Sequence, residues 1–300
     1  MSNEARSLTR WGKGHEYQSL ESFLAINNDS NPMVDKKFTL SIFIDGIPVD
    51  FLISLRGPDC VFFFHGNHPR EGTTLPVFVG QGVMENIDAS YVAISDPTLF
   101  LDEGMSLGWY TAVGKIDFQK ILPVIIKKLI KLFDFRNITF AGGSAGGFAA
   151  LYFSQAFDNI DLLVWNPQTD IMKYNQKAVD TLKTVTAKSF VTNEIDINIA
   201  NYYDISILDS FNVSKGNRIF FLQNFSDWHY PVHCVPFFEA LGVAISRDNL
   251  PKVSGWYHPS IYLHVGLDWG EGHAPPHKAL ISDFLDSILR KDHLYLCLGH

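Results

Sequence analysis

A serine flanked by glycines is the feature of this 300-residue chain with the clearest chemical potential. Residues 138–151 run from a β-branched and aromatic stretch, through Gly142-Gly143-Ser144-Ala145-Gly146, into a stretch with helical character. This is the strand–turn–helix setting of a G-x-S-x-G motif, whose tight turn exposes the serine hydroxyl. Side chains at Gly142 and Gly146 would collide with the neighbouring strand and helix. Ser144 is therefore a candidate nucleophile for attack on a carbonyl carbon.

The same glycines would also suit a phosphate-binding turn or a closely packed β–α turn. No Lys-Ser or Lys-Thr pair follows them, which argues against a Walker loop. A dinucleotide fingerprint also fits poorly, because several strands precede this one in the chain. The nucleophile hypothesis therefore depends on a base and an acid elsewhere in the sequence.

Two polar loops supply that base and acid. Asp227 is the first acid after the apolar run 218–222, and His273 lies in the Gly-rich loop after the run 261–265. The carboxyl ends of parallel strands meet at one edge of a sheet, so both side chains are expected beside Ser144. The order Ser, Asp, His along the chain is the order of the α/β-hydrolase triad, with His273 as base and Asp227 as the acid that orients it.

Other assignments remain open for the acid. Asp268 precedes His273 in the same loop, but this short Gly-rich segment would have to double back for the carboxylate to reach the ring. Asp170, past the strand that ends at Trp165, is the next alternative.

A metal site is a further alternative for this part of the chain. His229 and His233 lie four residues apart and, with Asp227, imitate a cluster on one helix face. Pro231 falls between the two histidines, and no further ligand is evident. We therefore expect neither a metal nor a cofactor.

Attack on a carbonyl needs fixed donors for the charge that develops on its oxygen. The segment His65-Gly66-Asn67 follows the apolar run 61–64, so the N–H of Asn67 or Gly66 is expected beside that of Ala145. His65 itself is expected to hold this loop. Among the aromatic residues near the strand ends, Trp109, Tyr110 and Trp228 are candidates for contact with substrate, although ordinary packing is the alternative for all three.

The elements that must position these residues alternate along the chain. Strands are expected at 38–44 and 49–53, on either side of an Asp45-Gly46 hairpin turn, and then at 61–64, 91–94, 138–141, 162–165, 218–222 and 261–265. Helical patterns separate the later strands, which predicts an α/β fold of about eight mostly parallel strands with an antiparallel start and helices on both faces. Residues 1–36 are polar and irregular, and we interpret them as an N-terminal extension. The domain spans 37–300, with a small helical cap at about 171–214.

Composition narrows the classes of function. The chain is 46% hydrophobic and carries a formal net charge of −8, which suits one large domain and argues against a nucleic-acid binder. The N-terminus lacks the apolar stretch of a signal peptide and no run approaches a membrane span, so a cytoplasmic protein is expected. Cys60, Cys234 and Cys297 are expected to be free, buried thiols.

Residues 37–290 resemble the α/β-hydrolase superfamily. His65-Gly66-Asn67 is similar to its oxyanion loop, Gly142-Gly143-Ser144-Ala145-Gly146 is similar to its nucleophile elbow, and residues 171–214 stand where a cap usually does. The resemblance implies a serine hydrolase that cleaves an ester of a small molecule or a glycan through an acyl-enzyme. An O-acyltransferase would use the same residues. A third hypothesis is a non-catalytic scaffold subunit in carbohydrate assembly, whereas a peptidase of the prolyl-oligopeptidase type would need an N-terminal propeller.

Overall fold

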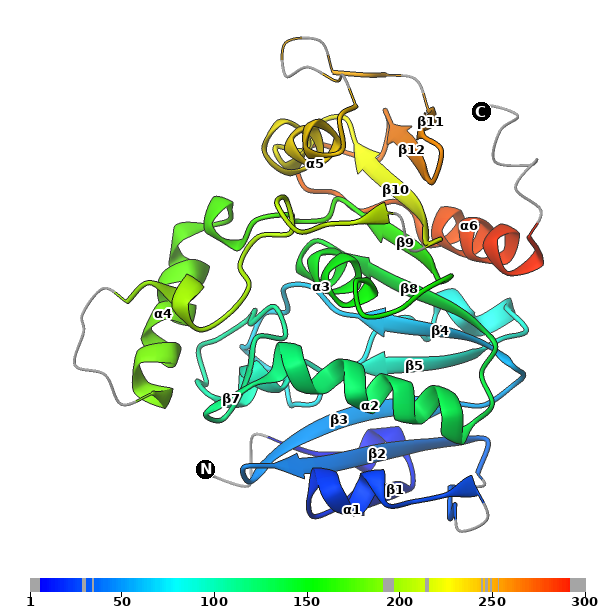
Figure 1. Ribbon diagram of the computed structural model, residues 1–300, viewed down its shortest axis with the longest axis vertical. Helices are drawn as coiled ribbons and strands as arrows, with labels where there is room; N and C mark the ends of the chain where they lie inside the picture. The colour runs from blue at the N-terminus through cyan, green and yellow to red at the C-terminus, as the bar shows by residue number, and fades with distance from the viewer. Residues whose placement is uncertain are drawn as a thin grey trace.

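The computed structural model describes residues 6–28, 31–33, 35–190, 197–213, 216–243, 245, 248, 250–252 and 254–291. Over these ranges, ten strands form one sheet in the order β1-β2-β3-β5-β4-β8-β9-β10-β12-β11 (Figure 1). Two further strands of two residues each, β6 and β7, pair to form a second sheet. The strands are β1 (Gly14–Tyr17), β2 (Lys37–Ile44), β3 (Ile47–Ser54), β4 (Asp59–Phe64), β5 (Ser90–Ile94), β6 (Ala112–Val113), β7 (Ile116–Asp117), β8 (Asn137–Gly143), β9 (Asp161–Trp165), β10 (Arg218–Asn224), β11 (Gly255–His258) and β12 (Ile261–Gly266). The α-helices are α1 (Leu20–Leu24), α2 (Phe118–Leu132), α3 (Ala145–Ser154), α4 (Gln176–Ser189), α5 (Val235–Ala240) and α6 (Lys278–Arg290).

The centre of the sheet is parallel and its start is antiparallel. Strands β5, β4, β8, β9, β10 and β12 run in one direction, each paired with the next. The β2–β3 hairpin turns at Asp45 and Gly46, which both have positive φ (50° and 74°), as the tight turn of a two-residue hairpin requires. The predicted fold class is confirmed.

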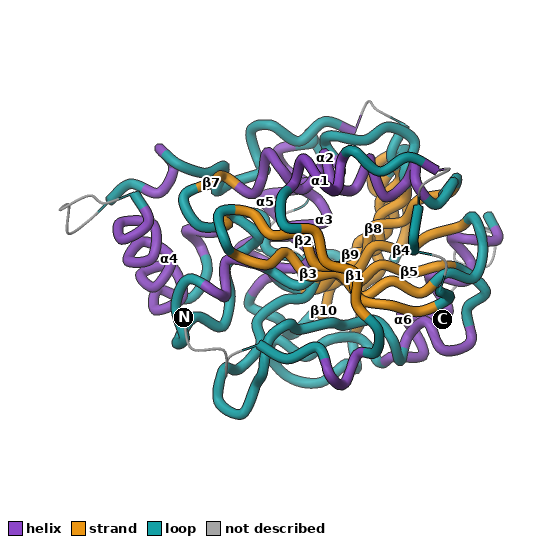
Figure 2. Tube along the Cα trace, turned by 90° about the horizontal axis from the view of Figure 1, so that it is seen from below, coloured by secondary structure: helices purple, strands orange, loops and turns teal. Residues whose placement is uncertain are grey.

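Helices cover both faces of the sheet (Figure 2). Helices α1, α2, α3 and α5 lie on one side and α6 on the other, and strand β4 shows how the sequence builds both layers. Phe62 and Phe64 belong to the core beneath α2 and α3, whereas Val61 and Phe63 belong to the core beneath α6. Side chains alternate across a strand, so an unbroken apolar run is what a strand buried on both faces requires.

Two of the ten strands exceed the predicted count of about eight. Strand β1 lies within the segment expected to be irregular and extends the sheet at one edge by pairing in parallel with β2. Strand β11 forms the other edge and pairs antiparallel with β12. Both are four residues long and partly exposed, so neither carries the apolar run on which the sequence prediction relied.

Helix α4 stands at the carboxyl end of the central strands, to the left in Figure 1. It lies within the segment 171–214, which also contains short 3-10 helices at Ile171–Lys173 and Ile199–Asn201. Cys60 and Cys234 are free and buried, whereas Cys297 lies outside the described residues. In the part of the chain that the structure describes, no helix has the length and apolar character needed to cross a membrane.

Candidate active site

Ser144 stands at the tip of the turn between β8 and α3, with φ 55° and ψ −121°. A positive φ is uncommon for a residue with a side chain, and such strain concentrates at functional sites. A Cβ atom on Gly142 would lie 2.4 Å from the carbonyl oxygen of Gly146, and one on Gly146 would lie 2.1 Å from that of Phe64. The neighbouring helix and strand therefore exclude side chains at both positions, as the sequence predicts.

His273 and Asp227 form a hydrogen-bonded pair from two loops at this edge of the sheet. Nδ1 of His273 lies 2.6 Å from Oδ2 of Asp227, whose side chain is fully buried. Oδ1 of Asp227 accepts the main-chain N–H of His229 at 2.9 Å, so both carboxylate oxygens have a donor. The His273 side chain is 33% exposed, and the bond at Nδ1 leaves Nε2 free to accept a proton.

The two rival acids do not pair with His273. Oδ1 of Asp170 accepts the main-chain N–H of Met172 at 2.8 Å and caps the 3-10 helix that follows. Asp268 is exposed. Of the three candidate acids, all of which lie within the described residues, Asp227 is the one that contacts the imidazole.

Two buried asparagines hold the loop that carries His273. Nδ2 of Asn224, in the last residue of β10, donates to three loop carbonyl oxygens at 3.0 to 3.2 Å, those of Gly270, Gly272 and Ala274. Nδ2 of Asn166 donates to the Ala274 oxygen at 2.9 Å, and its Oδ1 accepts the Asn224 N–H at 2.7 Å. The loop is thus tied to the sheet on both sides of His273. Sequence reasoning missed both residues, although an amide at the end of an apolar strand was a signal for them.

The hydroxyl of Ser144 has a partner that sequence reasoning also missed. Nε2 of Gln168, a fully buried residue just past β9, donates to Ser144 Oγ at 3.1 Å. Ser144 and His273, both in the described part of the chain, share no direct hydrogen bond. The bond between a nucleophile and its base often tightens only in the complex with substrate.

The loop after β4 lies against the elbow. A Cβ atom on Gly66 would lie 2.9 Å from the carbonyl oxygen of Gly143, 3.4 Å from Ser144 Cβ and 3.8 Å from the Ala145 nitrogen. Ala145 is the first residue of α3, so its N–H has no acceptor within the helix. Asn67, the next residue of the loop, is exposed. The structure therefore brings the suggested oxyanion loop to the start of α3.

His65 holds this loop in place. Its Nε2 accepts the Asp96 N–H at 3.0 Å and its Nδ1 lies 2.8 Å from the Gly66 oxygen, which places the proton on Nδ1. Burial lowers the pKa of His65 to about 4, so the ring is neutral at pH 7. These bonds agree with the structural role expected for His65.

Trp109 and Tyr110 lie inside the protein, with 0% and 1% of their surface exposed. The indole Nε1 of Trp109 donates to Gln168 Oε1 at 2.5 Å, and the Tyr110 hydroxyl donates to the Ile94 oxygen at 3.0 Å while accepting the His65 N–H at 2.7 Å. Sequence analysis suggested substrate contact for both residues. Because both side chains are buried, they offer no surface to a substrate in this structure, and they contact residues that line the site, Gln168 and His65.

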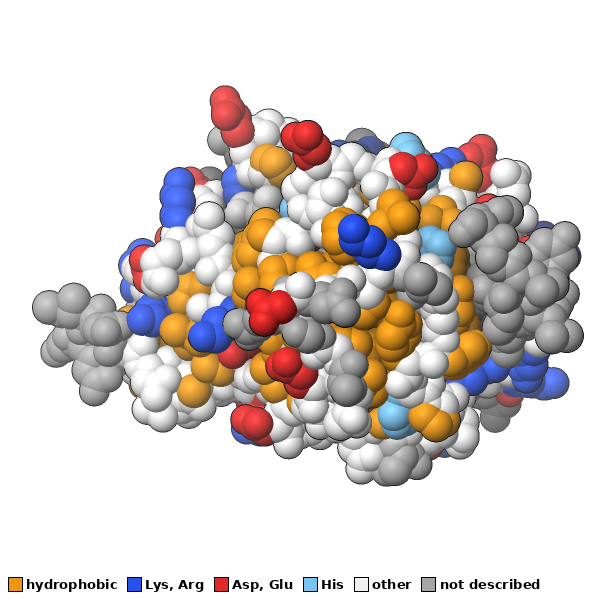
Figure 3. Space-filling view, turned by 90° about the horizontal axis from the view of Figure 1, so that it is seen from above, with side chains coloured by type: hydrophobic (Ala, Val, Ile, Leu, Met, Phe, Trp, Pro, Cys, Tyr) orange, Lys and Arg blue, Asp and Glu red, His pale blue; other side chains and the backbone are white. Residues whose placement is uncertain are grey.

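Trp228 differs, because 42% of its surface is exposed. Its ring stacks on that of Tyr174, with centroids 5.9 Å apart. Met172 and Leu267 are 38% and 59% exposed on the loops after β9 and β12, which end at the same edge of the sheet. Seen from the α5 and β11 end of the molecule, hydrophobic side chains gather near the middle of the face among scattered charged groups (Figure 3).

A three-residue group at the site could also offer ligands to a metal ion. Asp227, His229 and His273 each place one ligand atom within 4.8 Å of the others, and His233 is not part of the group. Two of the three residues already bind each other, through His273 Nδ1 and Asp227 Oδ2. Burial lowers the pKa of His229 to about 3, and the nearby His273 contributes, so His229 is neutral and packs its ring 4.0 Å from that of His273.

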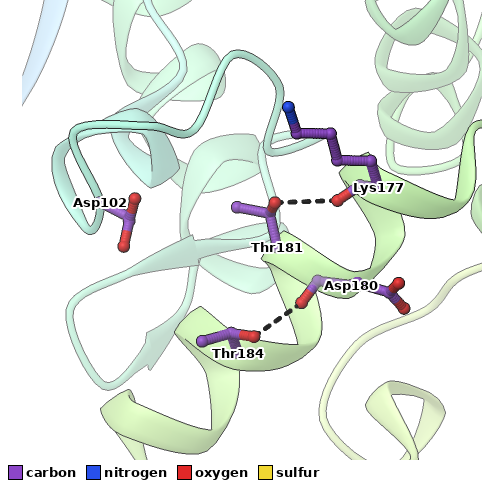
Figure 4. A pocket seen from close by; sticks show the side chains of 5 residues that line it. All are labelled: Asp102, Lys177, Asp180, Thr181 and Thr184. Carbon is purple, nitrogen blue, oxygen red and sulfur yellow. Dashed lines mark hydrogen bonds between the residues drawn. The ribbon is translucent and has the colours of Figure 1, made fainter.

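A separate polar pocket lies beside α4 (Figure 4). Its lining residues are Asp102, Lys177, Asp180, Thr181 and Thr184, and none of them belongs to the Ser144 site. The hydroxyls of Thr181 and Thr184 donate back to the helix carbonyl oxygens of Lys177 and Asp180 at 2.8 and 2.9 Å. These two hydroxyls are therefore already bonded within α4, and the pocket does not overlap the candidate active site.

Comparisons with known proteins give structural matches. No family model matches the sequence, and neither does any curated protein. The chain is similar to the capsule O-acetyltransferase of Neisseria meningitidis serogroup A in complex with CoA, with 15% identity, a TM-score of 0.59, and 82% of this chain and 96% of that chain covered. It is also similar to 2,6-dihydroxy-pseudo-oxynicotine hydrolase, with 15% identity, a TM-score of 0.51, and 91% and 72% covered. A chain of a glycosylation-associated protein complex from Streptococcus agalactiae matches with 13% identity, a TM-score of 0.55, and 85% and 46% covered.

At these identities the likenesses bear on the fold alone. The chain has the α/β-hydrolase fold. In an α/β-hydrolase fold, the turns after the parallel strands carry the chemistry. Ser144, Asp227 and His273 follow β8, β10 and β12, three strands of the parallel part of the sheet whose carboxyl ends lie at one edge.

Proposed function

We propose that this protein is a serine hydrolase that cleaves an ester through an acyl-enzyme. Ser144 is the nucleophile, His273 the general base, and Asp227 the carboxylate that orients His273. The observation that carries the proposal is the 2.6 Å bond between His273 Nδ1 and Asp227 Oδ2, on loops that flank a strained, glycine-flanked serine. The N–H of Ala145 and the loop at Gly66 and Asn67 supply the donors for the oxyanion.

The reaction runs in two halves. In the first, Ser144 Oγ bonds to the acyl carbon, its proton passes to His273 Nε2, and the ester C–O bond breaks as the leaving alcohol takes that proton. In the second, water attacks the acyl-enzyme, its proton passes to His273, and Ser144 leaves with a proton restored. Asp227 stays ionised throughout and stabilises the imidazolium.

A second candidate is transfer of the acyl group to a hydroxyl other than water. The likeness to a capsule O-acetyltransferase solved with CoA favours it. In that case a thioester would acylate Ser144, and a hydroxyl of a carbohydrate or small molecule would resolve the acyl-enzyme. The exposed ring of Trp228 offers an apolar surface on which a sugar could stack.

One experiment tests both candidates. The protein is incubated with p-nitrophenyl acetate or acetyl-CoA, and the mass of the peptide that contains Ser144 is measured, with Ser144→Ala as control. We expect acetylation at Ser144 that the control lacks. Faster release of the acetyl group with added mono- or oligosaccharides than with water identifies a transferase. A folded protein that acquires no acyl group from either donor, and that a fluorophosphonate does not label, contradicts the proposal and favours a non-catalytic scaffold.

A further inference from the structure

Gln168 is bound to the candidate nucleophile twice. Its main-chain N–H donates to the Ser144 carbonyl oxygen at 3.1 Å, and its side-chain Nε2 donates to Ser144 Oγ at 3.1 Å. Gln168 is fully buried, so its contact with the reacting oxygen is a fixed part of the protein interior. The triad described above does not account for this donor.

Trp109 fixes which end of the Gln168 amide faces Ser144. The indole Nε1–H donates to Gln168 Oε1 at 2.5 Å. An indole nitrogen can only donate, so the amide oxygen must face Trp109 and the NH2 group must face Ser144. Trp109 is itself fully buried, so this bond is shielded from solvent.

Trp109 in turn is held in an uncommon backbone conformation. Trp109 and Tyr110 have φ of 53° and 58°, in the left-handed region that residues with side chains seldom adopt. The buried carboxylate of Asp96 accepts the main-chain N–H groups of Gly108 and Tyr110, both at 3.1 Å, and so clamps the chain on either side of Trp109. A strained segment held in this way is typical of a functional site.

We propose that Gln168 is a further catalytic residue, oriented by Trp109 as a positioning residue. This inference rests on the proposed function, since it requires Ser144 to attack an acyl carbon. Because Ser144 Oγ accepts a hydrogen bond from Gln168 Nε2, the Ser144 O–H remains available to donate to His273 Nε2. The same N–H stabilises negative charge on Oγ when its proton leaves during acylation, and again when Oγ leaves the acyl carbon during deacylation.

The test measures the rate at which a fluorophosphonate labels Ser144, a reaction that forms the Oγ–P bond and expels fluoride while His273 takes the proton. Gln168→Glu keeps the shape and the acceptor for Trp109 but replaces the donor with a carboxylate oxygen. We expect Gln168→Glu and Gln168→Ala to label about 100-fold more slowly, comparable with the loss of one oxyanion donor. Gln119→Ala is the matched control, because Gln119 is also buried and bonded but lies away from Ser144.

A double-mutant comparison of Trp109 and Gln168 distinguishes a catalytic role of the Gln168 amide from a merely structural one. Trp109→Phe alone should slow labelling about tenfold, because the amide loses its anchor. In the Gln168→Ala background the same change should alter the rate less than twofold, since there is no amide left to orient. Additive losses of rate, or Gln168 variants that label at the wild-type rate once folded, overturn the inference. If wild-type Ser144 itself is unreactive towards both acyl donors and the fluorophosphonate, the proposed function fails instead.

Discussion

Nδ1 of His273 lies 2.6 Å from Oδ2 of Asp227, across 46 positions of sequence. The two residues come from different loops, one after β10 and one after β12, and these strands pair in parallel along six residues. The pairing brings both loops to the same edge of the sheet. The contact thus depends on strand register as much as on the two side chains.

This relationship gives a prediction about the acid. Asp227→Asn keeps the shape of the side chain but removes the charge that stabilises the imidazolium, so kcat should fall about 10⁴-fold. Asp268→Asn and Asp170→Asn should change kcat less than about tenfold, because neither carboxylate contacts His273. Kinetics of the three variants on one chromogenic ester decide the matter. If kcat falls steeply in Asp268→Asn or Asp170→Asn but not in Asp227→Asn, the acid has been misassigned.

Removal of the nucleophile should separate activity from folding. Ser144→Ala deletes one hydroxyl and should lower kcat about 10⁶-fold if the triad acts as a unit. Its free energy of unfolding should fall by no more than about 1–3 kcal/mol, because the glycines around the elbow stay intact and the bond lost is the one from Gln168 Nε2. Ester hydrolysis and urea unfolding of the same preparation measure the two effects. More than a hundredth of wild-type activity would rule out Ser144 as nucleophile.

Asn224 and Asn166 hold the His273 loop by hydrogen bonds to its carbonyl oxygens, and this pair, here called the asparagine clip, gives a third prediction. In Asn224→Asp, a carboxylate oxygen would face the three carbonyl oxygens to which the amide now donates, and repulsion should displace the loop. A displacement of about 1 Å costs about 100-fold in kcat. Because Ser144 is untouched, its phosphonylation by a highly reactive fluorophosphonate should still be detectable in this variant. Wild-type kcat in Asn224→Asp would mean that the clip does not position His273.

The packing at the elbow gives a prediction about stability. A Cβ atom on Gly146 would lie 2.1 Å from the main-chain oxygen of Phe64, which no side-chain rotation can relieve, so Gly146→Ala should cost at least about 2 kcal/mol of unfolding free energy. Gly57 has open space around its Cβ position, and Gly57→Ala should change stability by no more than about 1 kcal/mol. Equal stabilities of the two variants in urea would contradict the packing argument.

Buried histidines give a prediction about pH. The folded protein holds His65 neutral, with its pKa lowered to about 4, whereas the unfolded chain binds the proton near 6.5. The unfolded state therefore gains protons first as pH falls, and the stabilisation present above pH 6.5 is lost between pH 6.5 and 4. At pH 5 the loss from His65 is about 2 kcal/mol. His229 and His233, whose pKa values burial lowers to about 3, act in the same direction.

Urea unfolding at pH 7.5 and pH 5 measures this loss. In His65→Gln the difference between the two pH values should shrink by about 2 kcal/mol, whatever the absolute stability of the variant. His277→Gln is the control, because His277 is exposed. An unchanged pH difference in His65→Gln would show that the ring is not held neutral.

The sequence predicted those parts of the fold that carry strong local signals. Long apolar runs such as 61–64 and 162–165 became central strands, because a strand buried on both faces needs such a run. The strands β1 and β11 were not predicted because they lie at the edges of the sheet. There the strand forms by pairing with a neighbouring strand, and its amino-acid composition carries no apolar run. Ser144, Asp227 and His273 could be named as candidates because the G-x-S-x-G motif and the chain order point to them.

The supporting residues could not be predicted for a different physical reason. The roles of Gln168, Asn166 and Asn224 depend on which amide meets which carbonyl or hydroxyl across the sheet, and no spacing in the chain encodes that. Trp109 and Tyr110 were candidates for substrate contact, with ordinary packing as the alternative, because aromatic rings near strand ends suit either a binding surface or the protein interior. Their burial follows from the turn at residues 108–110, where Asp96 accepts the N–H groups of Gly108 and Tyr110. No sequence motif predicts this contact.

The order of the strands has a consequence for the growing chain. Ser144, the candidate nucleophile in the turn after β8, is synthesised and can pack at the centre of the sheet long before β12 exists. Strand β12 joins beyond β10, next to the edge strand β11. Until β12 pairs with β10, the loop that carries the candidate base His273 is not held at the edge of the sheet where Ser144 lies. On the proposed mechanism, a ribosome-bound or truncated chain that ends before residue 261 would carry a formed turn at Ser144 but no His273, and we expect such a chain to be unreactive until the sheet is complete.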